Sequence, residues 1–460
     1  MASVLGKTWW GLFSLLCFLL ISVGIFLRFD PIFRPQNNLL LLLLPLIWGS
    51  VLGTIKRFRP DLTVITPKNL MLFVWFNKLV IVPLEIIWVG NMIPVERHPN
   101  QDISTEICIT LVSFGAFVVG WSCFSQKQML RPVVAFSSLT TWASVYFLVA
   151  LVSLSLLYGS LENYLSGAIF TYVTREIVEQ NATFVGFLAN IGQRFWVFGV
   201  LLIWYKWKTK KGKIHWLRQV PWLILCLAGT LSSNRSNMAY PLLTLMSAMY
   251  AGWKTRHSFW LVMLLLGLIV LSLFFGYVRV QSSLDTEGIA LLFDNYLEHD
   301  EYITYAHQLY FGSPYQITPL LSIEKPSSTL LASLVDPIPI VGKAFREQSG
   351  PYVYNLAYHQ SLVSQDKVIP VAGELYYNGG YFLVTSGYAA IGVVYRWLDR
   401  TFKDNVLINP PLAAAFFYLA LLFNATLLLS LSVLTQFLVY NAAPALLIIA
   451  ANWSQIRKAS

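Results

Sequence analysis

Two arginines, Arg235 and Arg279, lie at the ends of strongly apolar stretches, where a charged side chain is energetically costly and is usually functional. Arg235 lies in the segment LSSNRSNMAYPLL, directly after Asn234 and among serines that can cap helix ends or offer hydrogen bonds. A helix is expected to begin near Asn237, so its first backbone amides would face the same place, as in anion sites at helix N-termini. The guanidinium group is a planar fork of donors that suits phosphate oxygens. These residues predict a site for an anionic, phosphate-bearing ligand.

Two of the arginines in or beside apolar stretches also have simpler explanations. Arg279 closes its apolar stretch in the segment YVRVQ, and it could be an interfacial arginine that extends its head group into water. Arg194 lies in the middle of an apolar stretch, beside Gln193 in LANIGQRFWVFG. Either it binds substrate, or it forms a buried ion pair with Glu85 or another acid.

The elements that position these arginines are membrane spans. The chain of 460 residues is 56% hydrophobic and only 12% charged, whereas a soluble domain carries about 25% charged residues. Apolar runs of about 20 residues recur, which excludes a large soluble protein. The sequence predicts an all-α polytopic membrane protein with about twelve transmembrane helices. The expected spans are 8–27, 38–55, 69–90, 105–124, 135–157, 183–205, 216–233, 237–253, 258–278, 375–396, 411–433 and 435–452.

The boundary between the last two spans is placed near Ser432–Gln436, because the apolar stretch from Pro411 to Trp453 is too long for one helix. Lys and Arg gather in the loops on one side of this map, and the acids gather on the other. Only the Lys and Arg bias sets orientation, and it places both termini in the cytoplasm. Arg235 and Arg279 then fall on the outer face, against the general bias. The net charge of +10 is a signal of topology, and no nucleic-acid partner is expected.

The predicted map divides the chain into three parts. Residues 1–279 hold spans one to nine with short loops, residues 280–374 form a large extracytoplasmic loop, and residues 375–460 hold spans ten to twelve. A loop of that length is usually functional or has structure of its own. Within it, residues 284–311 have helix-like spacing, and we expect a helix along the membrane interface. The smaller outer segment 158–182 is expected to be an amphipathic helix, either interfacial or packed on the bundle.

Several motifs, in the same order along the chain, resemble those of one protein family. The segment LSSNRSNMAYPLLTLMSAMYAGW resembles the arginine-containing turn and following helix of Wzy-type polysaccharide repeat-unit polymerases, which include the O-antigen and enterobacterial common antigen polymerases. YVRVQ is similar to the arginine that closes their next helix. DPIPIVGKAFREQSG resembles their proline-rich segment before a basic residue, here Arg346. GELYYNGGYFLVTSGYAAIGVVYRWLDR resembles a helix near their C-terminal end. The motifs cover about residues 225–400, and position 374 is one that varies in the family.

The resemblance implies a GT-C-like glycosyltransferase of the bacterial cytoplasmic (inner) membrane, with its active site facing the periplasm. Its substrate would be an undecaprenyl-pyrophosphate-linked oligosaccharide within the membrane lipid. Arg235 and Arg279 would stabilise the pyrophosphate leaving group. Glu374, at the outer start of a span, is the first candidate for the general base, with His359 and Asp336 as weaker ones. The remaining expected substrate-binding residues are Asn234, Arg194, Arg346, His359, Tyr352 and Tyr358, the tyrosines because aromatic rings stack on sugars.

Other functions stay open on the sequence alone. A glycan ligase would use the same donor and the same arginines. A transporter or flippase of the lipid-linked oligosaccharide would need several charged residues at mid-membrane, where Lys78, Glu85 and Arg194 are the candidates. No Walker A loop, dinucleotide fingerprint or HExxH motif is present. His299 and His307 are two helical turns apart, too far to share a metal, so we expect no metal and no cofactor. A chain-length regulator is a further candidate partner.

Overall fold

The computed structural model describes residues 38–55, 58, 65–88, 90–91, 103–123, 139–157, 184–192, 194–210, 240, 243–248, 300–321, 329–338, 341–359 and 369–459. Within these ranges the chain is helical and contains no strand. Three of these helical stretches are long and apolar enough to cross a membrane, or up to four if one bent pair forms a single span. The described part is therefore all-α, and its apolar helices indicate a membrane protein. The predicted spans 8–27, 216–233 and 258–278 lie outside it.

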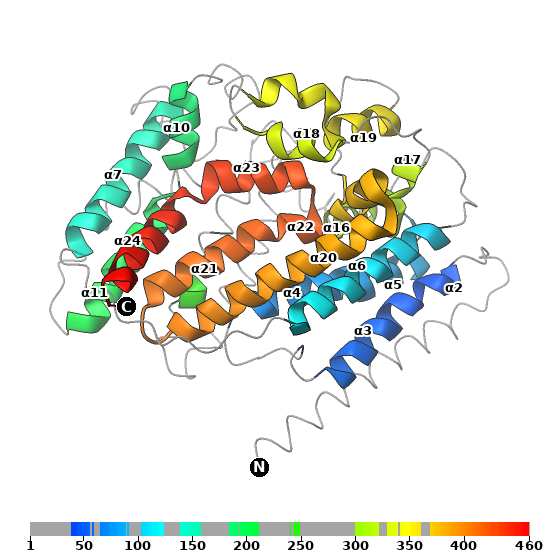
Figure 1. Ribbon diagram of the computed structural model, residues 1–460, viewed down its shortest axis with the longest axis horizontal. Coiled ribbons are helices and arrows are strands. Elements are labelled where there is room, and N and C mark those ends of the chain that lie inside the picture. Colours follow the sequence, from blue (N-terminus) through cyan, green and yellow to red (C-terminus); the bar gives the residue numbers. More distant parts are fainter. Residues whose placement is uncertain are drawn as a thin grey trace, which may run out of the picture.

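The centre of the molecule is the long helix α20 (Val371–Asn405), which lies beside α6 (Ser104–Cys123), α4 (Pro67–Phe76) and α21 (Pro410–Phe423) (Figure 1). Gly120 of α6 and Gly392 of α20 permit close packing, because a Cβ on either glycine would overlap backbone atoms of the opposite helix.

The N-terminal helices pack against one side of α20 and α6. They are α2 (Asn38–Leu41), α3 (Leu43–Thr54), α4, the π-helix η2 (Asn77–Ile81) and α5 (Val82–Trp88). Trp75 of α4 anchors this contact, with ring centroids 5.0 Å from Phe114 and 6.1 Å from Tyr388. The stretch from Pro67 to Trp88 and helix α6 confirm the predicted spans 69–90 and 105–124 as apolar helices of membrane-crossing length.

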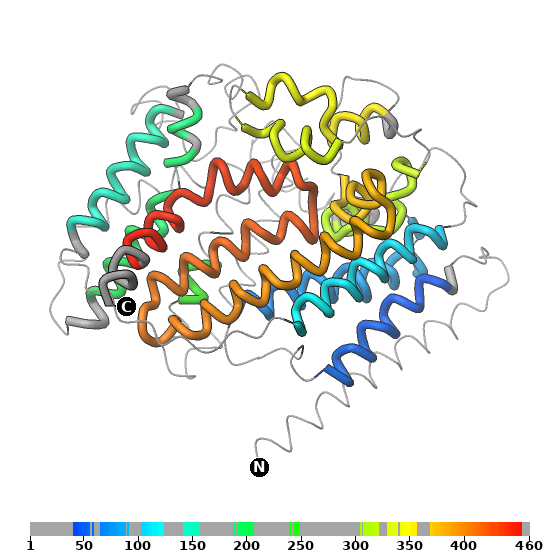
Figure 2. The backbone as a smooth tube through the Cα atoms, viewed as in Figure 1, coloured from blue at the N-terminus to red at the C-terminus, as the bar shows by residue number. Residues whose placement is uncertain are grey.

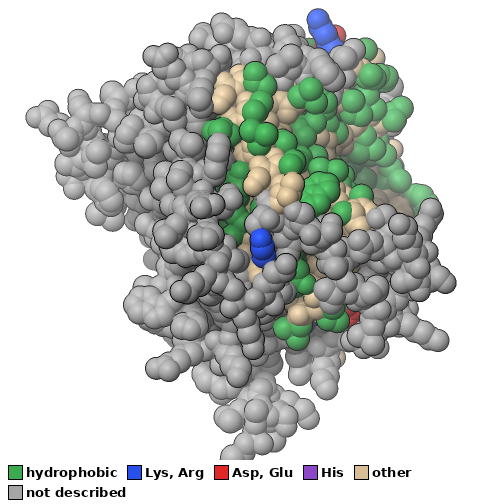
Figure 3. Space-filling view, turned by 90° about the vertical axis from the view of Figure 1, so that its left-hand side faces the viewer, with side chains coloured by type: hydrophobic (Ala, Val, Ile, Leu, Met, Phe, Trp, Pro, Cys, Tyr) green, Lys and Arg blue, Asp and Glu red, His purple; other side chains and the backbone are tan. Residues whose placement is uncertain are grey.

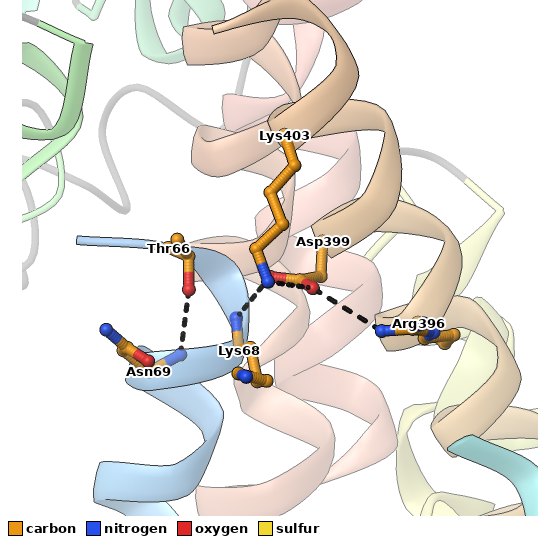
Figure 4. A network of polar contacts seen from close by, with 6 residues as sticks. All are labelled: Thr66, Lys68, Asn69, Arg396, Asp399 and Lys403. Atoms are coloured by element: carbon orange, nitrogen blue, oxygen red, sulfur yellow. Dashed lines mark hydrogen bonds and ion pairs between the residues drawn. The ribbon is translucent and has the colours of Figure 1, made fainter. Parts of the chain in front are cut away.

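A buried carboxylate joins the start of α4 to the far end of α20 (Figure 4). Asp399 is fully buried and accepts hydrogen bonds from the Lys68 backbone N–H at 3.1 Å and from Lys403 Nζ at 2.9 Å. Arg396 Nη1 lies 3.8 Å from the same carboxylate. Thr66 caps α4 by accepting from the Asn69 N–H. Because α4 begins with its amides at this carboxylate, the contact fixes the register of α4 against α20.

A second group of helices lies at the left of Figure 2, on the other side of α21. It contains α7 (Leu139–Leu157), α10 (Phe184–Gly192), α11 (Trp196–Lys210) and α24 (Ala443–Ala459). The predicted span 183–205 is not one helix, because α10 ends at Gly192 and α11 begins at Trp196. A tight turn separates them, with the Phe195 N–H bonded to Gly192 O at 3.1 Å.

The described part of the predicted outer loop is helical, as expected. It contains α16 (Asp300–Phe311), η5 (Pro314–Gln316), α17 (Thr318–Leu321), α18 (Leu330–Val335), η6 (Gly342–Ala344), η7 (Arg346–Gln348) and α19 (Gly350–His359). Helix α18 lies over α23 (Leu431–Asn441) at the top of Figure 1, and α19 lies beside α18. Helix α16 confirms a helix over the second half of residues 284–311. The rest of that range and all of 158–182 lie outside the described residues.

Helix α20 is interrupted near its start, which corrects the predicted span 375–396. Gly380 has φ +59° and ψ −154°, a conformation that is almost confined to glycine, and Gly379 before it is also non-helical. A short helical segment containing Glu374 thus precedes the glycine pair, and a straight helix continues to Asn405. The hydropathy signal ends at residue 396 because the last turns of the helix carry charges.

The predicted boundary at Ser432–Gln436 is wrong, because α23 runs through it without a break. The chain instead leaves the helix at Leu429, after α22 (Ala425–Leu428). Ser430 then caps α23 by accepting a hydrogen bond from the Val433 N–H at 3.2 Å. A second bend, of 63°, separates α23 from α24.

The outer surface of α7 is apolar. Its large exposed side chains recur at helical spacing, whereas the opposite face packs into the protein. The exposed residues are Trp142, Val145, Leu148, Val152 and Leu156. On the left-hand side of the molecule, hydrophobic side chains cover most of the described surface (Figure 3). A surface of this kind suits lipid better than water.

Candidate functional site

Polar residues that the sequence singled out gather where α18, α19, α20 and α23 meet. Glu374 lies in the first turn of α20 and is fully buried. Its Oε2 accepts a hydrogen bond of 3.2 Å from the backbone N–H of Leu431, the first residue of α23. The Val371 N–H also bonds to Leu429 O at 3.1 Å. Two contacts therefore fasten the start of α20 to the helix break at Leu429 and Ser430.

The charge state of Glu374 follows from its surroundings. Burial raises the pKa of this carboxyl from 4.5 to about 7, while the Ser333 hydroxyl and the Leu431 amide oppose the rise by stabilising the charged form. Glu374 lies ahead of the predicted span, on the side of the outer loop. Its other oxygen, Oε1, makes no hydrogen bond of good geometry with the described residues, although Ser333 lies close by. A carboxyl with a pKa near neutrality can exchange a proton at physiological pH.

Gly350 makes room for this carboxyl. A Cβ at position 350 would lie 2.6 Å from Glu374 Oε1 and 2.9 Å from Ser333 Oγ. The Gly350 N–H donates to Ser333 Oγ at 2.7 Å. The N-terminal ends of α19 and α23 thus both lie at Glu374, and their amides favour a negative charge between them.

A second carboxylate, Asp336, lies next to this centre at the C-terminal end of α18. Its Oδ2 accepts from Ser432 Oγ at 3.3 Å, and its Oδ1 lies 3.4 Å from Arg346 Nε. Burial raises the pKa of Asp336, and the nearby Arg346, Ser432 and Ser349 act in the opposite direction. The Arg346 side chain is 61% exposed. Asp336 therefore joins the outer loop to α23 and presents Arg346 at the surface.

Asn378 joins α18 to the short first segment of α20. Its Oδ1 accepts from the N–H groups of Thr329 and Leu330 at 2.8 and 3.2 Å. Its Nδ2 donates to Glu374 O at 2.7 Å. Asn378 thus binds both the start of α18 and the carbonyl of Glu374. Because Asn378 directly precedes the Gly379–Gly380 break, this break and the position of α18 are linked.

Of the predicted site residues, the structure brings Glu374, Asp336 and Arg346 together. Tyr352 lies on α19 and is partly buried. The same helix carries Tyr358 and His359, whose side chains lie outside the description. Arg235, Arg279 and Asn234 also lie outside the described residues, so their grouping stays a prediction.

Arg194 lies elsewhere, in the turn between α10 and α11. It is 5% exposed. The alternative explanation for Arg194, an ion pair with Glu85, is wrong for that acid, because Glu85 Oε2 lies 2.8 Å from Nδ1 of His307 on α16. The other ring nitrogen of His307 lies 3.0 Å from Asn77 Oδ1. His307 of the outer loop is thus inserted between two polar residues of the stretch Pro67–Trp88.

The sequence analysis missed the serines of the site, Ser333 and Ser432. The only local signal was the cluster of small polar residues before α23, where Ser430 begins a helix. Lys78 was noted as a charge within a span, and it is 3% exposed. Its Nζ donates to Leu427 O at 3.4 Å, near the end of α22. Comparison of the chain with protein-family models, with curated proteins and with solved structures finds no match.

Proposed function

We propose that this protein is a lipid-linked-oligosaccharide-dependent glycosyltransferase that polymerises repeat units on the extracytoplasmic face of a bacterial inner membrane. The observation that carries the proposal is Glu374, a fully buried carboxyl with a pKa near 7 at the N-terminal ends of two helices. It lies where the predicted outer segment packs against the apolar helices. A sugar hydroxyl needs a base there, and the motif order resembles a polymerase family. About twelve spans with a GT-C-like arrangement belong to the same proposal.

The proposed reaction exchanges one bond for another. The acceptor hydroxyl attacks the anomeric carbon of the donor, the bond from that carbon to the pyrophosphate breaks, and Glu374 takes the hydroxyl proton. The undecaprenyl pyrophosphate leaves with the electron pair. Arg235 and Arg279 are assigned to its developing charge, and Arg346 with Tyr352, Tyr358 and His359 to the glycan.

The test uses purified protein in lipid nanodiscs with a synthetic lipid-linked repeat unit, and it measures the ladder of polymer products. We expect Glu374→Gln to lower the transfer rate about 100-fold or more, because a general base contributes at least that much. The matched control is Glu106→Gln, which alters another buried carboxyl, one that accepts from Thr318 Oγ1 at 2.7 Å. Transfer by Glu374→Gln at the wild-type rate would reject Glu374 as the base.

A second candidate, a transporter of the same lipid-linked oligosaccharide, is favoured by one observation. Lys78 is buried in the π-helix η2, beside the end of α22. Glu85, on the same stretch Pro67–Trp88, forms a polar pair with His307 of α16. Charged groups beside a broken helix are typical of transport sites. A fluorescent lipid-linked sugar in sealed vesicles distinguishes the two, because only a transporter moves it across the bilayer without joining sugars. A ligase would instead transfer it once, to an added acceptor.

A further inference from the structure

Two nitrogens of the Arg194 guanidinium group are buried without an acceptor among the described residues. The side chain is 5% exposed, and its Nε and Nη1 make no hydrogen bond with the described residues. The ionisable side chains close enough to interact with it electrostatically are Tyr418 and Tyr240. The hydroxyl of Tyr418 also has no hydrogen-bond partner in the described chain. These polar groups form a cluster with N–H and O–H donors and no anion to receive them.

The acids of the described helices are engaged at other places. Glu85 pairs with His307, Glu106 accepts from Thr318, Glu374 accepts from Leu431, and Asp399 pairs with Lys403. An unpaired buried guanidinium costs several kcal/mol. Residues 211–239, which precede Tyr240 in the sequence, contain no Asp or Glu. None of these four acids compensates the charge of Arg194, and a bound anion would supply the acceptor that its guanidinium group lacks.

The backbone around Arg194 favours the same kind of ligand. The predicted span is broken here, so that α11 begins at Trp196, two residues after Arg194, inside an apolar stretch. The first amides of a helix have no partners in their own helix and attract anions. Half-helix ends at this depth face anionic groups in other membrane proteins.

We propose that Arg194, Tyr418 and the N-terminal end of α11 form a phosphate-binding site for a lipid whose chain lies in the membrane. Phosphate oxygens supply the acceptors that the guanidinium fork and the tyrosine hydroxyl lack. A ligand at this depth must also bring an apolar chain, which excludes free phosphate as the natural occupant. The choice of a polyprenyl carrier over an ordinary phospholipid rests on the proposed function. Tyr240 packs on Phe437 of α23, with ring centroids 5.9 Å apart, and so links this site to the helix whose first amide, at Leu431, donates to Glu374.

The test measures lipid binding by native mass spectrometry and by melting temperature, with the full-length protein in detergent. The probes are a polyprenyl phosphate, phosphatidylglycerol and inorganic phosphate. We expect Arg194→Gln to weaken polyprenyl phosphate binding about 10- to 100-fold, because the loss of a hydrogen bond between charged groups lowers affinity by about that factor. Tyr418→Phe, which keeps the ring, should weaken it less. Arg400→Gln, which changes a partly buried arginine on α20, is the matched control and should bind as the wild type does.

A second variant, in which the charge is absent, shows whether weaker binding is caused by misfolding. Arg194→Met replaces a buried charge by an apolar chain of similar length, so without ligand it should melt at or above the wild-type temperature. Polyprenyl phosphate should then raise the melting temperature of the wild type and not of Arg194→Met. Equal binding of both lipids would identify a structural phospholipid at the same phosphate site. Equal binding of polyprenyl phosphate by wild type, Arg194→Gln and Arg194→Met would overturn the proposal, while the transfer test of Glu374 would be unaffected.

Discussion

Two buried ionisable residues, Glu374 and Arg194, both lie among hydrogen-bond donors, with opposite consequences for their charge. Glu374 lies among donors, namely the Leu431 amide and the Ser333 hydroxyl, so a negative charge can form there at moderate cost. Arg194 also lies among donors, but it is itself a donor, so its charge has no partner in the described chain. The first arrangement suits proton exchange, and the second suits the binding of an anion.

The raised pKa of Glu374 predicts how stability depends on pH. The unfolded carboxyl loses its proton near pH 4.5, and the folded one near about 7. Between these values the folded state binds more protons, so the free energy of unfolding falls as pH rises, by up to about 3 kcal/mol. Glu374→Gln removes this loss. The melting temperature of Glu374→Gln relative to wild type should therefore increase from about pH 5 to about pH 8. A difference that stays constant across this range would contradict the raised pKa.

The sequence identified Glu374, Asp336 and Arg194 because each is a polar residue in or beside an apolar stretch. It could not predict their partners, which come from distant parts of the chain. Ser432 reaches Asp336 across 96 positions, and His307 reaches Glu85 across 222. The alternative pair of Arg194 with Glu85 was wrong for this reason. The partner of Glu85 is His307, which comes from the predicted outer loop.

At the scale of elements, helix breaks decide where the polar residues lie. Hydropathy located the helices, since α4 to α5 and α6 follow the predicted ranges closely. It could not locate the break between Gly192 and Trp196 or the breaks at Gly379 and Leu429, because apolar residues continue on both sides of each. At the break at Leu429 a helix begins within an apolar part of the chain, and its first amide donates to Glu374. These local backbone changes turn a bundle of apolar helices into a protein with candidate sites.

The break in α20 can be tested by Gly380→Ala. A Cβ in the Gly380 conformation is strained, so we expect a loss of stability of about 1–3 kcal/mol. The strain would also displace the segment that carries Glu374 and Asn378, so transfer should fall further than stability. Gly49→Ala in α3 is the control, because no atom lies within 4 Å of its added Cβ and alanine favours a helix. Unfolding in denaturing detergent and the polymer ladder measure the two effects. Equal stability of both variants would mean that Gly380 does not need its positive φ.

At the scale of the whole molecule, composition predicts membrane helices, and the distribution of charge predicts their orientation. The low content of charged residues predicted apolar helices, and the exposed apolar face of α7 agrees with burial in lipid. The orientation across the membrane came from the distribution of Lys and Arg alone. This predicted orientation would put the Glu374 site outside and the Asp399 network inside. Every functional assignment to the extracytoplasmic face depends on this orientation.

Cysteine labelling tests that orientation directly. Leu331 on α18 and Leu407 after α20 are 63% and 74% exposed, and the predicted map places them on opposite faces. In a background in which the four native cysteines are replaced, a membrane-impermeant maleimide should label Leu331→Cys in intact spheroplasts. Leu407→Cys should be labelled only after the membrane is permeabilised, because its side chain is then reached from the cytoplasm. Labelling of Leu407→Cys in intact cells, with Leu331→Cys protected, would invert the molecule and place Glu374 on the cytoplasmic face, which contradicts the proposed function.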